Sequence, residues 1–201
     1  LHPWEHNEVP VLLGAALRLD APIVAIHLTR PPVLIPDREA LGMPSHFEAA
    51  KGAYVVRDYD AQLPKGGTVI VQGASAMENI IKILPELVLR KMNVKIVCAT
   101  SPQLYQLQTE TYRNRVLSPA DRLDSMVITT QARWLMHDWI FNPLAEDYAL
   151  SADWDNRWRT GGNLEEVLDE AHLSPQHILA GIQRFVESRT ERLKSIQAGL
   201  E

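Results

Sequence analysis

The stretch that decides the fold is 66–99, GGTVIVQGASAMENIIKILPELVLRKMNVKIVCA. It reads as a strand at 68–72, a turn at Gly73-Ala74-Ser75, a helix at about 76–91 and a second strand at 94–99. A strand, a helix and a strand at this spacing form a unit whose two strands lie parallel in one sheet. The stretch therefore predicts an α/β fold.

The rest of the chain continues the pattern. Further strands are predicted at 125–130 and 148–152, and a short helix at 134–141. Helix starts are indicated by a cap residue followed by proline or by a capping box, at Ser101-Pro102, Asn163 with Glu166, and Ser174-Pro175, the last opening a helix to about residue 197. We predict a mostly parallel sheet flanked by helices, formed by residues 66–201.

The first third of the chain has a different character. A helix is predicted at 8–19, followed by IVAIHL at 23–28, a β-branched run without polar alternation. Such a run is typical of a central parallel strand that is covered on both faces. From 33 to 65 the chain is rich in proline and charge, so we predict a linker, with a short patch at 53–56 that could pair as a strand.

Composition excludes several classes of function. The 201 residues carry 20 basic and 25 acidic side chains and are 46% hydrophobic, which gives material for one ordinary domain or slightly more. The acidic balance disfavours nucleic-acid and anionic membrane partners. One cysteine, Cys98, excludes a disulfide framework, and no apolar run is long enough for a membrane span, so a soluble cytoplasmic protein is expected. Because the chain opens at Leu1 rather than methionine, we expect a fragment.

Two candidate sites lie where predicted strands end, which is where open parallel sheets place their ligands. Arg30 follows the run at 23–28, and its guanidinium could hold a phosphate or carboxylate while Pro31-Pro32 fix the direction of the chain. The alternative is a solvated strand end. Gly73 and Ser75 begin the helix after the strand at 68–72, and the backbone N–H groups there form a candidate anion site, or an ordinary strand-to-helix turn.

No complete catalytic set is present in the sequence. Serine hydrolase elbows, paired catalytic carboxylates and cysteine-histidine pairs are absent, so no catalytic residue is assigned. His2 and His6 stand four apart, but Pro3 falls between them and no third ligand follows at a recognisable spacing. We therefore predict no metal site.

Several segments, taken in order, resemble the last third of a transketolase. The matching stretches are His6-Asn7-Glu8-Val9 with the helix after it, the strand that ends at Thr29-Arg30, Lys51-Gly52-Ala53-Tyr54-Val55, Val71-Gln72-Gly73-Ala74-Ser75, Asn93-Val94-Lys95-Ile96-Val97, Tyr112-Arg113 with Val116-Leu117, and the helices from 164 onward. The resemblance divides the chain into the end of a pyrimidine-binding domain (1–32), a linker (33–65) and a transketolase C-terminal domain (66–201).

The resemblance implies a specific role for the chain. Transketolases are dimeric enzymes of the pentose phosphate pathway that use thiamine diphosphate and magnesium to transfer a two-carbon ketol unit between sugar phosphates. In that family the arginine at the position of Arg30 helps to bind the substrate phosphate, while the cofactor-binding and catalytic residues lie upstream of the matching region. This chain would contribute Arg30 and subunit interface to a homodimer, depend on upstream thiamine-binding domains, bind no cofactor itself and be inactive alone. Pro31-Pro32 replace the Gln-Asn that follows this arginine in the family.

Two other functions stay open. The same architecture forms the C-terminal domain of the homodimeric pyruvate dehydrogenase first component and of deoxyxylulose phosphate synthase. A function of another class is a non-catalytic regulatory domain that binds an anion at Gly73 and Ser75.

Overall fold

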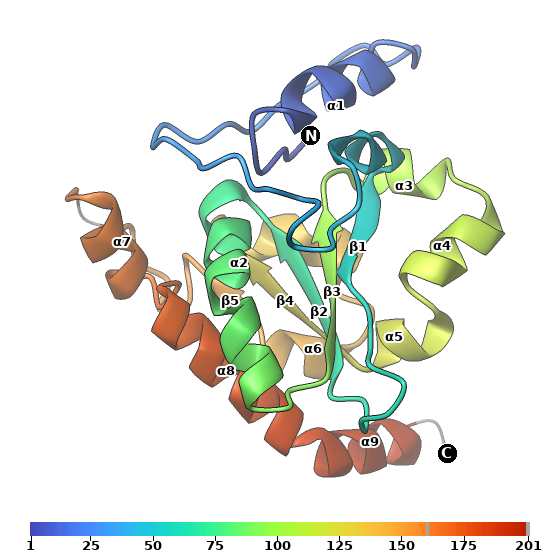
Figure 1. Cartoon of the computed structure of the whole chain (residues 1–201), viewed down its shortest axis with the longest axis vertical. Coiled ribbons are helices and arrows are strands. Elements are labelled where there is room, and N and C mark those ends of the chain that lie inside the picture. The colour runs from blue at the N-terminus through green and yellow to red at the C-terminus, as the bar shows by residue number, and fades with distance from the viewer. Residues whose placement is uncertain (160, 200–201) are drawn as a thin grey trace.

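The computed structural model describes residues 1–159 and 161–199. At its centre is a five-stranded sheet of order β1-β3-β2-β4-β5, formed by β1 (Ala53–Arg57), β2 (Gly67–Gln72), β3 (Val94–Ala99), β4 (Ser125–Thr129) and β5 (Leu150–Ser151) (Figure 1). Strands β2 to β5 pair in parallel, and β1 pairs antiparallel with β3 at the edge. The predicted α/β fold with a mostly parallel sheet is confirmed.

Helices cover both faces of the sheet (Figure 1). One face carries α2 (Ala74–Leu89) and α8 (Pro175–Glu187), whose Ile80 and Ile182 pack in a core with Val69 and Val71 of β2. The other face packs against side chains from α3 (Pro102–Gln106), α4 (Glu110–Val116) and the 3₁₀ segment η2 (Arg133–Trp139). Successive residues of a strand point to opposite faces, so the central strands are buried on both sides and read as continuous apolar runs.

Four further α-helices precede α8 in the chain. They are α1 (Glu8–Ala16), α5 (Pro119–Leu123), α6 (Pro143–Asp147) and α7 (Leu164–Glu170), and a short 3₁₀ helix, η1, spans His46–Lys51. The predicted capping box of Asn163 and Glu166 is present at the start of α7. Strand β1 uses the patch that the sequence allowed within the predicted linker, and the domain boundaries at 32 and 65 stay predictions.

The prediction of a strand at 23–28 is wrong. This segment belongs to no strand among the described residues, and Ile23 and Leu28 are 84% and 62% exposed. Its recorded backbone pairing is with Leu1, which donates its amino group to Ala25 O at 2.7 Å and accepts from His27 N–H at 2.9 Å. The sequence pattern of a central strand is therefore present without the neighbouring strands and covering helices that such a strand needs.

The prediction of one unbroken final helix that runs to about residue 197 is also wrong. It divides at Ser188 into α8 and α9 (Arg189–Ala198). The Ser188 hydroxyl donates to Phe185 O at 3.1 Å, and Arg192 binds Asp124 with Nη2 to Oδ1 at 2.7 Å. A serine that bonds its own backbone competes with helix continuation, and this buried ion pair holds the new direction.

A buried ionic cluster joins the N-terminal segment to the rest of the fold. Arg38 Nη2 lies 2.9 Å from Glu5 Oε1 and 2.8 Å from Glu8 Oε1, and both carboxylate side chains are fully buried. Tyr54 of β1 donates its hydroxyl proton to Glu8, and Trp4 donates its indole N–H to Tyr54 at 2.8 Å. Residues 1–16 are therefore fastened through Arg38 to β1.

Candidate functional site

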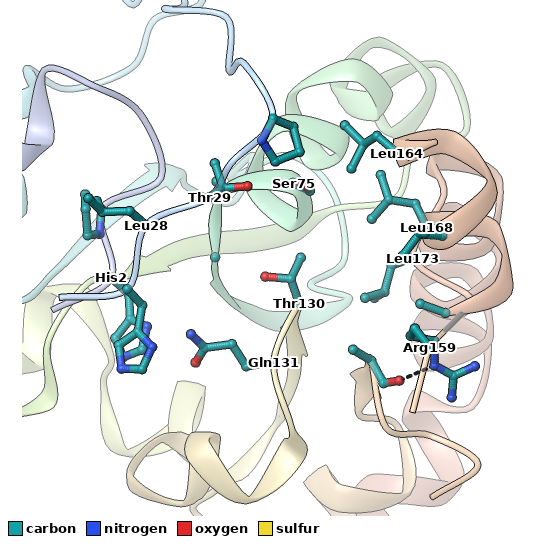
Figure 2. Close-up of a pocket in the computed structure, with 18 residues that line it drawn as sticks. His2, Leu28, Thr29, Ser75, Thr130, Gln131, Arg159, Leu164, Leu168 and Leu173 are labelled. Atoms are coloured by element: carbon teal, nitrogen blue, oxygen red, sulfur yellow. Dashed lines mark hydrogen bonds between the residues drawn. The ribbon is translucent and has the colours of Figure 1, made fainter. Parts of the chain in front are cut away.

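The candidate site lies where the topology of the sheet reverses. From β2 the chain moves through α2 to β3 on one side, whereas from β4 it moves to β5 on the other side. In open α/β sheets the crevice at such a switch point, outside the carboxyl ends of the strands, is the usual ligand site. A cavity of about 360 Å³ occupies this position, lined by Gly73, Ser75, Thr130 and Gln131 among others (Figure 2).

Gly73 is required by the close approach of two strand ends. Its φ is +104°, and an added Cβ would lie 2.3 Å from Thr130 Oγ1. Gly73 is also the residue before α2, which has no side-chain cap, and Ser75 lies in the first turn. The structure therefore brings Gly73 and Ser75 into one cavity together with Thr130, and anion binding there stays a prediction.

The N-terminal segment forms part of the wall of this cavity. His2, Leu28 and Thr29 line it from that segment and are labelled in Figure 2. The His2 ring is fixed by stacking on His27, with centroids 4.5 Å apart and planes 8° apart. Burial, then the chain's amino terminus and His27, lower the pKa of His2 to about 3, so the ring is neutral at physiological pH.

Arg30 lies between two residues that line the cavity but does not line it. Thr29 and Pro31 contribute to the wall, whereas the Arg30 side chain is exposed and forms no hydrogen bond or ion pair with the residues that the structure describes. It follows an extended segment rather than the strand that was predicted. The guanidinium is thus exposed and unpaired among the described residues, and it is not part of the cavity wall.

The cation that does line the cavity is already paired. Arg159 donates its Nε–H to Ala152 O at 2.8 Å (Figure 2). It also donates its Nη1–H to Glu170 O at 3.0 Å, and its Nη2 forms an ion pair with Asp155. These bonds hold the loop after β5 against α7. Arg159 therefore contributes little free positive charge to the cavity.

Sequence reasoning missed Thr29, Thr130, Gln131 and Arg159. Thr130 and Gln131 could have been found, because they lie at and just after the end of a predicted strand, where ligand-facing residues gather. Thr29 follows the segment that was wrongly predicted as a strand. Arg159 could not have been found, since it enters the site from a loop whose fold is set by tertiary contacts. No sequence signal points to it.

Neither a candidate metal-binding cluster nor a membrane-crossing helix is found in the part of the chain that is described. Residues 1–159 and 161–199 contain no group of three or more His, Cys, Asp or Glu side chains that could hold a metal ion. His2 is tied to His27 by stacking, while His6 is exposed. Within the same residues, none of the helices has the length and apolar character of a membrane-crossing helix.

Comparison with solved structures connects the fold to known proteins. A transketolase mutant (H261F) from Pichia stipitis aligns over 92% of this chain with a TM-score of 0.67 and 16% sequence identity. The fold is that of the transketolase C-terminal region. Transketolase from Leishmania mexicana aligns over 73% of the chain (TM-score 0.51, 14% identity), as does the P. stipitis transketolase complex with sedoheptulose 7-phosphate (TM-score 0.52, 14% identity).

This transketolase-like chain is much shorter than those enzymes. It spans 25% of the H261F transketolase chain and 19% and 20% of the other two. No family model and no curated protein matches the sequence.

Proposed function

We propose that this chain is the C-terminal part of a thiamine-diphosphate-dependent transketolase that transfers a two-carbon ketol unit between sugar phosphates, and that Arg30 binds the substrate phosphate. The observation that carries the proposal is the unpaired Arg30 guanidinium, exposed between Thr29 and Pro31 of the cavity wall. A guanidinium free of protein carboxylates can offer a phosphate two parallel charge-assisted hydrogen bonds. Pro31-Pro32 limit the backbone freedom of the segment that presents it.

The exposed segment at 23–28 supports the proposal that another domain or subunit packs against this chain. Its apolar side chains, including Ile23 and Leu28, face solvent although their pattern is that of a buried strand. Apolar surface of this kind marks a site of contact with another domain or subunit. Upstream thiamine-binding domains would supply the neighbouring strands, and a homodimer would complete the active sites.

The thiamine diphosphate and its magnesium belong, in this proposal, to the upstream domains rather than to this chain. When bound in the whole enzyme, the cofactor would supply the carbanion chemistry, and this chain's part would be to bind and orient the phosphate end of the substrate.

Activity assays of the protein isolated from its native source, with every polypeptide that accompanies it, test the proposal. Ketol transfer from xylulose phosphate to ribose phosphate is expected. Pyruvate-dependent reduction of an artificial electron acceptor instead would favour the pyruvate dehydrogenase first component, and condensation of pyruvate with glyceraldehyde phosphate would favour deoxyxylulose phosphate synthase.

A regulatory anion-binding domain is the second candidate, favoured by the uncapped start of α2 in the cavity. It predicts that inorganic phosphate raises the thermal stability of the chain, that Arg30→Ala preserves this effect, and that Ser75→Leu abolishes it. Loss of the effect with Arg30→Ala would favour the transketolase role instead.

A further inference from the structure

Arg30 lies in a stretch of chain that has no regular secondary structure. Residues 20–36 form no helix or strand, residues 27–30 are exposed, and the backbone bends at Arg30 and Pro31. A side chain on a loose segment binds a ligand weakly, because the segment must be ordered when the ligand binds. The contacts that already order this segment therefore decide how well Arg30 can hold a phosphate.

The chain is fixed three residues after Arg30. Val33 is 9% exposed and belongs to the hydrophobic core that also contains Trp4. Between Arg30 and Val33 stand Pro31 and Pro32, whose rings hold φ at about −65°. One side of the bend is thus anchored in the core through a short, stiff connection.

The chain is also fixed three residues before Arg30, by a contact between two rings. His27 stacks on His2, with centroids 4.5 Å apart and planes 8° apart. His2 is itself held in place, because its backbone N–H donates to Thr100 O at 2.8 Å and Trp4, two residues further on, is 2% exposed. Stacked aromatic pairs contribute stability beyond the area that they bury. The exposed His27 ring therefore has a fixed surface to rest on.

His2 does not bind a phosphate by its own charge. Burial, as the largest cause, lowers the pKa of His2 to about 3, so the ring is neutral at physiological pH. Its Nδ1 is buried as well, which removes that atom from contact with a ligand. The part that His2 can play is to fix the plane and the position of the His27 ring.

We propose that His27 is a positioning residue, whose stack on His2 acts together with buried Val33 to hold the bend that carries Arg30. This inference rests on the proposed role of Arg30 in phosphate binding. Without the stack, the segment before Arg30 keeps more freedom in the unbound protein, and binding of the phosphate must then order it. Loss of the stack should therefore weaken substrate binding without changing the chemical step.

Ketol-transfer kinetics of the complete enzyme test the proposal. His27→Ala should raise the KM for both sugar phosphates at least threefold with less than a twofold change in kcat, and should leave the KM for glycolaldehyde, an unphosphorylated acceptor, unchanged. His27→Phe keeps a stacking ring but has no imidazole to contact a phosphate, so it should retain the KM of the unaltered enzyme. His46→Ala is the control, because that ring contacts Phe47 at 4.3 Å in η1 and should change neither constant. Unchanged KM values for His27→Ala, or an equal rise for His27→Phe, would overturn the proposal.

A double variant and a measurement without substrate separate this inference from the proposed function. If His27 acts through Arg30, His27→Ala combined with Arg30→Ala should have the KM of Arg30→Ala alone, and independent effects that multiply would refute the positioning role. If Arg30→Ala alone leaves KM unchanged, the proposed function fails, and nitrogen-15 relaxation of the 201-residue chain still decides whether His27 orders the segment. The order parameters of the Thr29 and Arg30 N–H groups should fall in His27→Ala and be kept in His27→Phe. Equal order parameters in the unaltered chain and in His27→Ala would contradict the inference.

Discussion

Gly73 and Thr130 meet so closely at the switch point of the sheet that a single added carbon at Gly73 would lie 2.3 Å from Thr130 Oγ1. This contact brings the ends of β2 and β4 together, and both residues line the cavity. It also makes the site depend on one glycine, because φ is +104° there.

Gly73→Ala should therefore be strongly destabilising. Strain at a glycine-only backbone conformation costs about 1–3 kcal/mol, and the clash with Thr130 adds to it. We expect the free energy of unfolding to fall by about 2–4 kcal/mol in urea titrations. The matched control is Gly14→Ala in α1, where an added Cβ meets no atom within 4 Å and helix propensity improves by up to about 1 kcal/mol. Equal effects of the two changes would contradict the strain argument.

Arg38→Met should detach the N-terminal segment. It leaves the buried carboxylates of Glu5 and Glu8 without their cation, and breaking a buried ion pair in this way costs about 3–5 kcal/mol. The surface pair of Arg90 and Glu86 supplies the control, since Arg90→Met should cost under about 1 kcal/mol.

The Arg38→Met variant should also be more sensitive to alkali. Burial raises the pKa of Glu8 above its ordinary value, so the folded state holds a proton more tightly than the unfolded state does, and this contribution to stability is lost as pH rises through the folded pKa. Without Arg38 the Glu8 pKa rises further. The stability deficit of the variant should thus be larger at pH 8 than at pH 5, and a deficit that does not change with pH would refute the role of Glu8.

His2 should make the chain sensitive to acid. Its folded pKa of about 3 lies below the ordinary value of 6.5, so the unfolded state binds the proton more tightly, and stability falls as pH drops below about 6.5 toward 3. His2→Phe keeps a ring that can stack on His27 and should flatten the stability profile between pH 6 and 4. His6→Phe, at an exposed position, is the control and should leave the slope unchanged.

The central part of the sheet could be predicted from the sequence because β2, α2 and β3 each carry a local signal. The apolar run of a strand buried on both faces, the glycine turn and the helix after it can be recognised without knowledge of their neighbours. The capping box of α7 is equally local. These signals concern a few adjacent residues, and the structure confirms them.

The same reasoning failed where the outcome depends on partners. The apolar pattern of 23–28 indicates burial, but among the described residues nothing covers Ile23 or Leu28. The break between α8 and α9 depends on Asp124, more than sixty residues away from Arg192. Likewise, Gly73 could be singled out because it follows a predicted strand, whereas Arg159 lines the same cavity through tertiary contacts that no local pattern indicates.

The central claim, that Arg30 binds the phosphate of a sugar phosphate, is tested most directly by ketol-transfer kinetics of the complete enzyme carrying Arg30→Ala. We expect the KM for both sugar phosphates to rise at least tenfold with a smaller change in kcat, because a group that holds only the phosphate end of a substrate binds ground state and transition state alike. Arg18→Ala, at an exposed arginine just after α1, should leave KM unchanged. Unaltered KM values for Arg30→Ala, or an equal rise for Arg18→Ala, would contradict the claim.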